Sequence, residues 1–162
     1  MQNVDKLKSL PAVSIIVPVF NEAAQLNGLI AAASSWQADE LIFVDGSSDD
    51  GTANSLKQAF AGHDEVAVLS TTAGRAQQMQ YGAERAVCDW VLFVHADTSL
   101  PINYRDALLA AEQESCGWGR FNLKFSPSYS TYLNKAMRVI AAFINTRSRL
   151  THIATGDQAL FV

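Results

Sequence analysis

Two side chains that can bind a divalent cation, His95 and Asp97, follow directly after the apolar run 91–94. The run is too short for a helix, so it predicts a strand that is buried on both faces. In an extended continuation of that strand, His95 and Asp97 would point to the same side. A carboxylate and an imidazole in one crevice can hold a cation, which can in turn bind a diphosphate. The alternative is that Asp97 only caps the next helix.

A second polar segment, residues 45–52, reads Asp-Gly-Ser-Ser-Asp-Asp-Gly-Thr and follows another apolar run. Its carboxylates and hydroxyls suit hydrogen bonding to the base and ribose of a nucleoside. It lacks the Gly-x-Gly-x-x-Gly spacing that cradles a dinucleotide pyrophosphate, and it is not a Walker loop. The alternative is a solvated turn in which Asp49 or Asp50 caps a helix, but capping does not account for Asp45.

The elements that must position these residues alternate regularly between strands and helices. Apolar runs predict strands at residues 13–19, 40–45, 66–69 and 91–94. Helical patterns separate them, one opening at Glu22 after a capping Asn21, one running through Phe60 and one over residues 75–87. This alternation predicts a parallel sheet with right-handed crossovers. A carboxylate just past a buried parallel strand then stands where open α/β sheets bind ligands.

The pattern changes after Pro101. Residues 103–114 predict a helix, residues 117–125 alternate like an exposed strand, and residues 129–144 predict a long helix with an apolar stripe. We expect that stripe to pack in the core, with contact to a membrane surface as the alternative. The chain stops at Val162 within an apolar run typical of a strand, so we expect a fragment of a longer protein.

Length and composition favour a single domain of an ordinary globular protein. The chain has 162 residues, of which 49% are hydrophobic and 17% are charged. Its apolar runs are shorter than a bilayer span, and its N-terminal residues lack the features of a signal peptide. Cys88 and Cys116 form no metal or redox motif, so we expect free thiols and a cytoplasmic location.

The net charge of −4 argues against a nucleic-acid-binding surface, but the charges are distributed unevenly. No carboxylate occurs between Glu114 and Asp157. The cations of that segment are Arg120, Lys124, Lys135, Arg138, Arg147 and Arg149. A cationic block on an otherwise acidic chain predicts contact with an anionic substrate or an anionic membrane surface.

Four segments in order resemble the landmarks of family 2 glycosyltransferases. They are Val17-Pro-Val-Phe-Asn-Glu22, Phe43-Val-Asp-Gly-Ser-Ser-Asp-Asp-Gly-Thr52, Gly74-Arg75 at the start of a helix, and Phe93-Val-His-Ala-Asp97. The resemblance covers residues 13–162 and implies the GT-A fold, an α/β domain with a Rossmann-like, mostly parallel sheet flanked by helices. It implies that residues 13–100 bind the nucleotide-sugar and that residues 101–162 form a smaller, incomplete acceptor side.

The resemblance also implies which residues contact the donor nucleotide. Pro18 and Glu22 match positions that contact the base and the ribose, and Asp45 matches an aspartate that binds uracil or its equivalent. Asp50 matches the second aspartate of the same turn, and Arg75 matches a basic position near the nucleotide.

Metal binding and the catalytic base are implied in the same way. Asp97 matches the last aspartate of the family's metal-binding Asp-x-Asp, which holds Mn or Mg against the diphosphate. His95 replaces the first aspartate of that motif, and imidazole suits Mn better than Mg. This replacement leaves the identity of the metal open between Mn and Mg. Asp157 stands where the family carries its base and would take a proton from an acceptor hydroxyl. A turn or cap role is the alternative for Asp157.

Two further segments allow simpler interpretations. Trp118 and Arg120 could contact an acceptor sugar or the diphosphate, although a Trp in an exposed strand is more often explained by packing. The run 77–80, Gln-Gln-Met-Gln, predicts the polar face of a helix.

These observations predict a metal-assisted, inverting transfer of a sugar from a nucleotide-sugar donor to an unknown acceptor. That acceptor could be a sugar, a lipid-linked molecule or a small molecule, with peripheral contact to the inner face of a membrane. A nucleotidyltransferase is one alternative, but residues 18–22 are not the Gly-rich, basic loop that it would need after the first strand. A non-catalytic nucleotide- or sugar-binding module is another, because the Asp-x-Asp is substituted.

Overall fold

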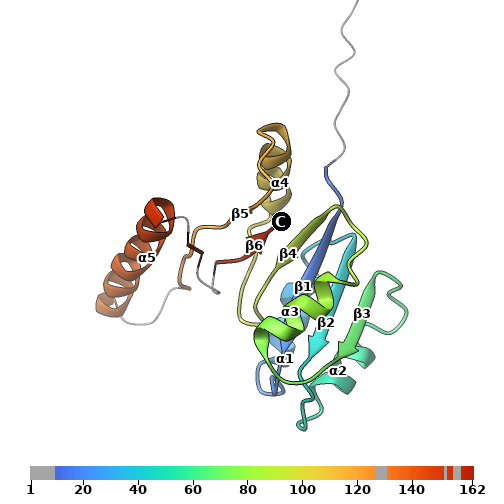
Figure 1. Cartoon of the computed structure of the whole chain (residues 1–162). Helices are drawn as coiled ribbons and strands as arrows, with labels where there is room; N and C mark the ends of the chain where they lie inside the picture. The colour runs from blue at the N-terminus through green and yellow to red at the C-terminus, as the bar shows by residue number, and fades with distance from the viewer. Residues whose placement is uncertain (1–9, 127–130, 152, 155–157) are drawn as a thin grey trace, which may run out of the picture.

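The computed structural model describes residues 10–126, 131–151, 153–154 and 158–162. Within this part, a six-stranded sheet has the order β3-β2-β1-β4-β6-β5 (Figure 1). The strands are β1 (Val13–Val19), β2 (Glu40–Asp45), β3 (Val66–Ser70), β4 (Trp90–Phe93), β5 (Gly119–Arg120) and β6 (Leu160–Phe161). Strands β1 to β4 pair in parallel, while β6 pairs antiparallel with β4 and β5. The predicted, mostly parallel α/β sheet is confirmed.

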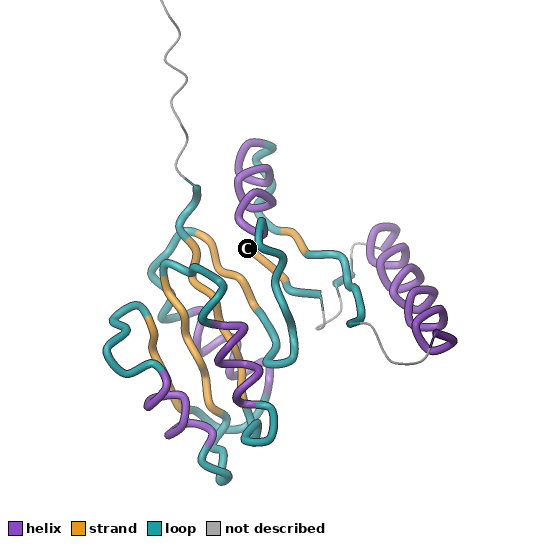
Figure 2. Tube along the Cα trace, turned by 180° about the vertical axis from the view of Figure 1, so that it is seen from behind, coloured by secondary structure: helices purple, strands orange, loops and turns teal. Residues whose placement is uncertain are grey.

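Helices cover both faces of this sheet. They are α1 (Leu26–Ala33), α2 (Thr52–Ala59), α3 (Arg75–Ala83), α4 (Tyr104–Gln113) and α5 (Thr131–Thr151). In Figure 1, α3 crosses in front of the sheet, whereas α1 and α2 lie behind it. Helix α5 stands apart from the sheet in both Figure 1 and Figure 2, beyond β5 and β6.

The side chains of β1 alternate between two hydrophobic cores. Ile15 and Val17 join the larger core, to which α1, α2 and α4 contribute. Ile16 belongs to the smaller core, against which Tyr81 and Ala83 of α3 pack. Because both faces of the sheet are covered, every residue of β1 is buried. This burial explains why the strand is a nearly unbroken apolar run.

Helix α3 lies close against the sheet at Gly82. A Cβ atom at this position would lie 2.6 Å from Cγ2 of Ile16 and 3.1 Å from Cγ2 of Val44. A side chain larger than hydrogen would therefore force the helix away from β1 and β2. Glycine at this position lets the backbone of α3 rest directly on the strands that carry the polar loops.

The first helix begins later than the sequence predicts. It starts at Leu26 rather than Glu22, because the chain turns first and the N–H of Gln25 donates to the carbonyl of Glu22 at 2.9 Å. The expected capping role of Asn21 is wrong, since the residue before this helix is Gln25 and no side chain caps it.

The strand predicted over residues 117–125 is reduced to Gly119–Arg120. One further backbone bond, from the N–H of Phe121 to the carbonyl of Ala159, continues the ladder at 3.0 Å. Beyond it, the N–H and carbonyl of Leu123 bond to the side chain of Asn145 at 2.8 and 3.0 Å. The side-chain amide of Asn145 therefore makes the hydrogen bonds that a neighbouring strand would otherwise make with Leu123.

The apolar stripe of α5 is exposed, so the expectation that it packs in the core is wrong. Tyr132 is 84% exposed, Val139 is 69% exposed and Phe143 is 70% exposed. A periodic apolar pattern predicts one apolar face of a helix but not the surface that covers it. Among the described helices, none is both long enough and apolar enough to cross a bilayer.

Candidate functional site

The strand order reverses between β1 and β4. The chain passes from β1 to β2 and β3 on one side, and then crosses to β4 on the other side of β1. Ligands of open α/β sheets bind beyond the carboxyl ends of the strands at such a reversal. Glu22 follows β1 and His95 follows β4 at this point. The fold therefore brings two of the predicted site segments to the edge where a ligand would bind.

Asp45 lies at the carboxyl end of β2, next to this reversal. It is in register with Val19 of β1 and with Ser70 of β3, and it is only 2% exposed. Its carboxylate accepts hydrogen bonds from the N–H of Ser48 at 3.0 Å and from the hydroxyl of the same residue. Because a carboxylate has about four acceptor positions, these contacts fix Asp45 and leave capacity for a ligand donor.

Asp50 joins the loop after β2 to the loop after β1. Its Oδ2 atom accepts from the N–H of Ala23 at 2.8 Å. Its Oδ1 atom accepts from the N–H of Thr52 at 3.0 Å and from the hydroxyl of that residue at 2.6 Å. The hydroxyl of Thr52, followed by the N–H of Ala23, lowers the pKa of the Asp50 carboxyl below its ordinary value. Asp50 is thus an ionised cross-link between the two loops.

Three more hydrogen bonds tie the same loops together. The N–H of Asn21 donates to the hydroxyl oxygen of Ser48 at 2.9 Å, and the N–H of Asp49 donates to Oδ1 of Asn21 at 3.1 Å. The N–H of Glu22 donates to Oγ1 of Thr52 at 2.9 Å. Asn21 adopts the left-handed backbone conformation with φ of 52°, which asparagine tolerates better than most residues. The two loops form one interlocked unit.

Gln78 is a site residue that the sequence analysis missed. It was predicted to lie on a polar helix face, but it is 3% exposed. Its Nε2 atom donates to the carbonyls of Val19 and Val44 at 2.8 and 2.7 Å, which joins the carboxyl ends of β1 and β2. Its spacing of four residues from Gly82 could have identified it, because this spacing puts both residues on one face of α3.

The segment after β4 turns earlier than expected. The N–H of Thr98 donates to the carbonyl of His95 at 3.0 Å, and the chain turns at Ala96 and Asp97. The extended geometry that would align His95 with Asp97 is therefore absent. His95 is 7% exposed, whereas Asp97 is exposed.

The residues after β4 supply a carboxylate, which both Mn and Mg accept, and an imidazole, which suits Mn better than Mg. Among the described residues, no group of three or more His, Cys, Asp or Glu side chains is arranged to hold a metal ion. The ligand types of His95 and Asp97 suit a cation such as Mn whose remaining ligands are phosphate oxygens and water, but the turn at Ala96 and Asp97 does not align the two side chains.

The other predicted donor contacts also lie on or beside this edge. Pro18 is buried in β1, in register with Val44, and Glu22 is partly buried in the following loop. Arg75 is exposed at the first residue of α3, directly after Gly74. Its guanidinium is therefore available to an anionic ligand at this helix start.

Trp118 and Arg120 lie in a separate region, between β5 and α5. Together with Gly119, Asn122, Ser148 and Arg149 they line a cavity of about 370 Å³. Arg120 donates to the carbonyl of Asn145 at 3.1 Å and to Oδ1 of Asn122 at 3.3 Å. Burial and the neighbouring Arg149 lower the pKa of Arg120, which still remains charged at neutral pH. Asp157, the predicted base, lies outside the described residues.

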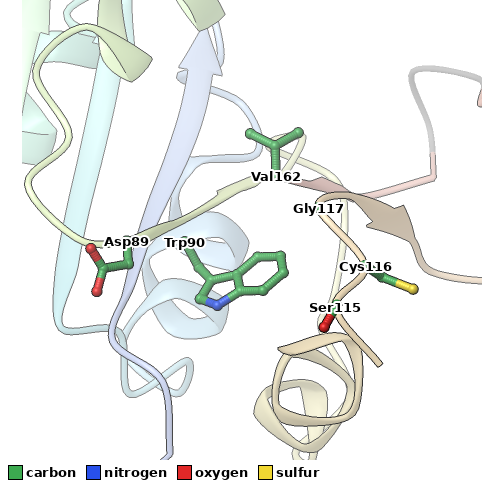
Figure 3. Close-up of a pocket in the computed structure, with 6 residues that line it drawn as sticks. All are labelled: Asp89, Trp90, Ser115, Cys116, Gly117 and Val162. Carbon is green, nitrogen blue, oxygen red and sulfur yellow. The ribbon is translucent and has the colours of Figure 1, made fainter. Parts of the chain in front are cut away.

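A second cavity, of about 330 Å³, lies at the other end of β4 (Figure 3). Trp90, Cys116 and Val162 are among the residues that line it. Because Trp90 is the first residue of β4, this cavity is at the amino end of the strand. It is therefore not part of the site at the carboxyl edge. Cys88 and Cys116 are free thiols, as expected.

A mostly parallel sheet with polar loops at the carboxyl ends of β1, β2 and β4 defines a Rossmann-like α/β domain. Residues 14–161 match the family described as glycosyl transferase family 2, and the chain belongs to that family.

One curated relative is the undecaprenyl-phosphate 4-deoxy-4-formamido-L-arabinose transferase of Shewanella sediminis (strain HAW-EB3). It is 31% identical over 115 residues, which are 66% of this chain. The chain spans only 35% of the length of that relative.

Two solved structures share the fold. Mannosyltransferase PcManGT from Pyrobaculum calidifontis, in complex with GDP-Man and Mn²⁺, superposes with a TM-score of 0.64 at 22% identity. That match covers 95% of this chain and 45% of the other. S. aureus TarS 1-349 superposes with a TM-score of 0.62 at 19% identity, over 74% of this chain and 38% of the other. The GT-A fold expected from the sequence is confirmed.

Proposed function

We propose that this chain transfers a glycosyl group from a nucleotide-sugar donor to an acceptor hydroxyl at the carboxyl edge of its sheet. The observation that carries the proposal is the position of Asp45. This buried aspartate ends β2 beside the strand reversal, in a member of glycosyl transferase family 2. In this proposal, residues 13–100 bind the donor and residues 101–162 belong to the acceptor side.

The donor nucleotide lies against the interlocked loops after β1 and β2. Asp45 accepts a hydrogen bond from the base, because its carboxylate is fixed by Ser48 and has acceptor positions left. Pro18 and Glu22 contact the base and the ribose from the β1 side. Asp50 holds the two loops together and so shapes this surface. This position supports a role for Asp50 in nucleotide binding. Arg75 attracts the diphosphate from the start of α3.

Asp97 and His95 would hold a Mn or Mg ion against the diphosphate. When bound, the metal offsets the negative charge that develops on the departing nucleoside diphosphate. The exposed position of Asp97, at the turn beyond β4, supports a ligand role for its carboxylate. The burial of His95 restricts the orientations of its ring, which would help to fix the metal beside β4.

Asp157 is proposed as the general base. It would accept the proton of the acceptor hydroxyl while that oxygen forms a bond to the anomeric carbon. The bond from the anomeric carbon to the diphosphate oxygen breaks in the same displacement, so the anomeric configuration inverts. Trp118 and Arg120 line a cationic cavity that suits the acceptor or the diphosphate.

A lipid-linked acceptor is the class that we favour. The curated relative is named for transfer involving undecaprenyl phosphate. The cationic segment between Glu114 and Asp157 would suit the phosphate of such an acceptor. A lipid-linked acceptor would place this chain at the cytoplasmic face of a membrane.

Release of nucleoside diphosphate from a panel of nucleotide-sugars tests the proposal. We expect release from one donor class, faster with Mn or Mg and with an added polyprenyl phosphate. Donor binding with no release of nucleoside diphosphate would contradict transfer and would assign the chain as a binding module.

A further inference from the structure

The polarity of α5 is inverted relative to an ordinary surface helix. A helix on a globular protein normally buries its apolar side and exposes its polar side. In α5, the four most exposed large apolar side chains are Tyr132 at 84%, Leu150 at 77%, Phe143 at 70% and Val139 at 69%. An exposed apolar surface of this kind marks a site of contact with another partner.

The opposite side of α5 is attached to the rest of the chain by polar contacts. The side chain of Asn145 bonds to the N–H and carbonyl of Leu123 at 2.8 and 3.0 Å. The hydroxyl of Ser148 donates to Oε1 of Gln158 at 2.8 Å, and both residues are buried. Nε2 of Gln158 donates to Oδ1 of Asn145 at 3.1 Å. These bonds fix the helix with its apolar stripe pointing outward.

The exposed apolar residues form one continuous stripe. At 3.6 residues per turn, Tyr132, Val139, Phe143 and Leu150 fall within a sector of about 40° around the helix axis. Lys135 and Arg147 lie about 60° to either side of the centre of this sector. Both cations are exposed. The stripe is therefore bordered by a positive charge on each side.

Charge decides which partner this surface fits. Helix α5 carries Lys135, Arg138, Arg147 and Arg149 and no carboxylate. Two copies of α5 packed face to face would repel each other, which disfavours a second copy of this chain. An anionic lipid surface offers apolar tails to the stripe and negative headgroups to the bordering cations. Because no described helix can cross a bilayer, α5 would lie along the surface.

We propose that α5 is an interfacial helix that docks this chain on an anionic membrane. Tyr132, Val139, Phe143 and Leu150 enter the boundary between headgroups and acyl chains, while Lys135 and Arg147 pair with lipid phosphates. This inference rests on the proposed function, because it names the surface that brings the glycosyl-transfer site to a membrane. Vesicle binding needs neither donor nor acceptor, so its failure is distinguishable from failure of glycosyl transfer.

The test is flotation of the chain with vesicles of phosphatidylglycerol and phosphatidylcholine, compared with vesicles of phosphatidylcholine alone. We expect binding to the anionic vesicles, weak binding to the neutral ones, and release at about 1 M salt, where the Debye length is about 3 Å. The double variant Val139→Asn, Phe143→Asn should lose binding. The double variant Lys135→Gln, Arg147→Gln should bind about 25-fold more weakly, at about fivefold for each cation removed.

The matched control is Val87→Asn. Val87 is 80% exposed but lies between α3 and β4, far along the chain from α5. This variant should bind the anionic vesicles as tightly as the unmodified chain does. Far-ultraviolet circular dichroism and the midpoint of thermal unfolding should be unchanged in all variants.

Four results would overturn the proposal. The unmodified chain could fail to float with anionic vesicles, or the Val139→Asn, Phe143→Asn variant could float equally well. Sedimentation could instead detect a dimer that this variant abolishes, which would assign the stripe to a second copy. Unfolding of the same variant would also contradict the proposal, because it would mean that the stripe packs against the chain itself.

Discussion

Gln78 packs its side-chain amide against the backbone of Gly46, so closely that a Cβ atom on Gly46 would lie 3.1 Å from the amide atoms. The same amide donates to the carbonyls of Val19 and Val44, at the ends of β1 and β2. One helical side chain therefore fixes the start of the acidic loop relative to the first two strands. The geometry of the proposed nucleotide site therefore depends on a residue that need not touch the nucleotide.

Gln78→Ala should destabilise the chain by about 1–3 kcal/mol, because it removes two buried hydrogen bonds, to the carbonyls of Val19 and Val44. The carbonyl of Val19 keeps its second donor, the N–H of Gly46 at 2.9 Å. The measurement is the free energy of unfolding in urea. Gln80→Ala is the matched control, since Gln80 is exposed on the same helix and bonds only to Glu84 in the contacts described. Equal stability of the two variants would show that Gln78 does not hold the strand ends.

Gly82→Ala and Gly28→Ala should change stability in opposite directions. A Cβ at position 82 would meet Ile16 at 2.6 Å, so overpacking should cost about 1–3 kcal/mol. A Cβ at position 28, in α1, would meet nothing within 4 Å. Alanine there should stabilise the helix by about 1 kcal/mol. Thermal unfolding of both variants measures this difference, and a stabilising Gly82→Ala would contradict the close packing of α3.

Asp50→Asn should flatten the dependence of stability on acid pH. The pKa of Asp50 is lowered in the folded chain, chiefly by the hydroxyl of Thr52. The ionised carboxylate of Asp50 therefore stabilises the folded chain at pH values above 3.8, its pKa in the unfolded chain. This stabilisation is lost as the pH falls through the lower pKa of the folded chain. Urea unfolding at a series of acid pH values measures the effect. Asp49→Asn, which removes the same charge from the same loop, is the control and should retain the steeper loss.

Asp157→Asn should retain donor binding and lose glycosyl transfer, because the amide cannot accept the proton of the acceptor hydroxyl. Donor binding is measured by calorimetry and transfer by release of nucleoside diphosphate. A variant that transfers at the original rate would remove Asp157 as the base. Asp106→Asn, at an exposed carboxylate in the first turn of α4, is the control and should leave both measurements unchanged.

The central sheet was predictable from the sequence because its inner strands β1 and β2 are buried on both faces. Apart from Ser14, the run at β1 is apolar on both sides of the pleat, and its seven residues are too few for a typical helix. The carboxyl ends of parallel strands share one edge, which placed Asp45 and His95 correctly at that edge without any contact being known.

Other features depend on tertiary contacts that a local pattern does not contain. Glutamine is usually a solvent-exposed residue, and only the proximity of two strand ends explains the burial of Gln78. The turn at Ala96 and Asp97 replaces the extended segment because the carbonyl of His95 accepts a local hydrogen bond. The stripe of α5 has the period of a buried face, but Asn145 and Ser148 turn the opposite side inward.

The most direct test of nucleotide-sugar use is the midpoint of thermal unfolding with a panel of nucleoside diphosphates, each with and without Mn or Mg. One nucleotide should raise the midpoint, and metal should enlarge the rise. A ligand that binds only the folded chain adds about 2.7 kcal/mol to the free energy of unfolding when it is present at about 100 times its Kd. Asp97→Ala should fold normally and lose the enlargement by metal. No rise with any nucleotide would contradict the donor site, and an Asp97→Ala variant that responds to metal like the unmodified chain would contradict the metal site.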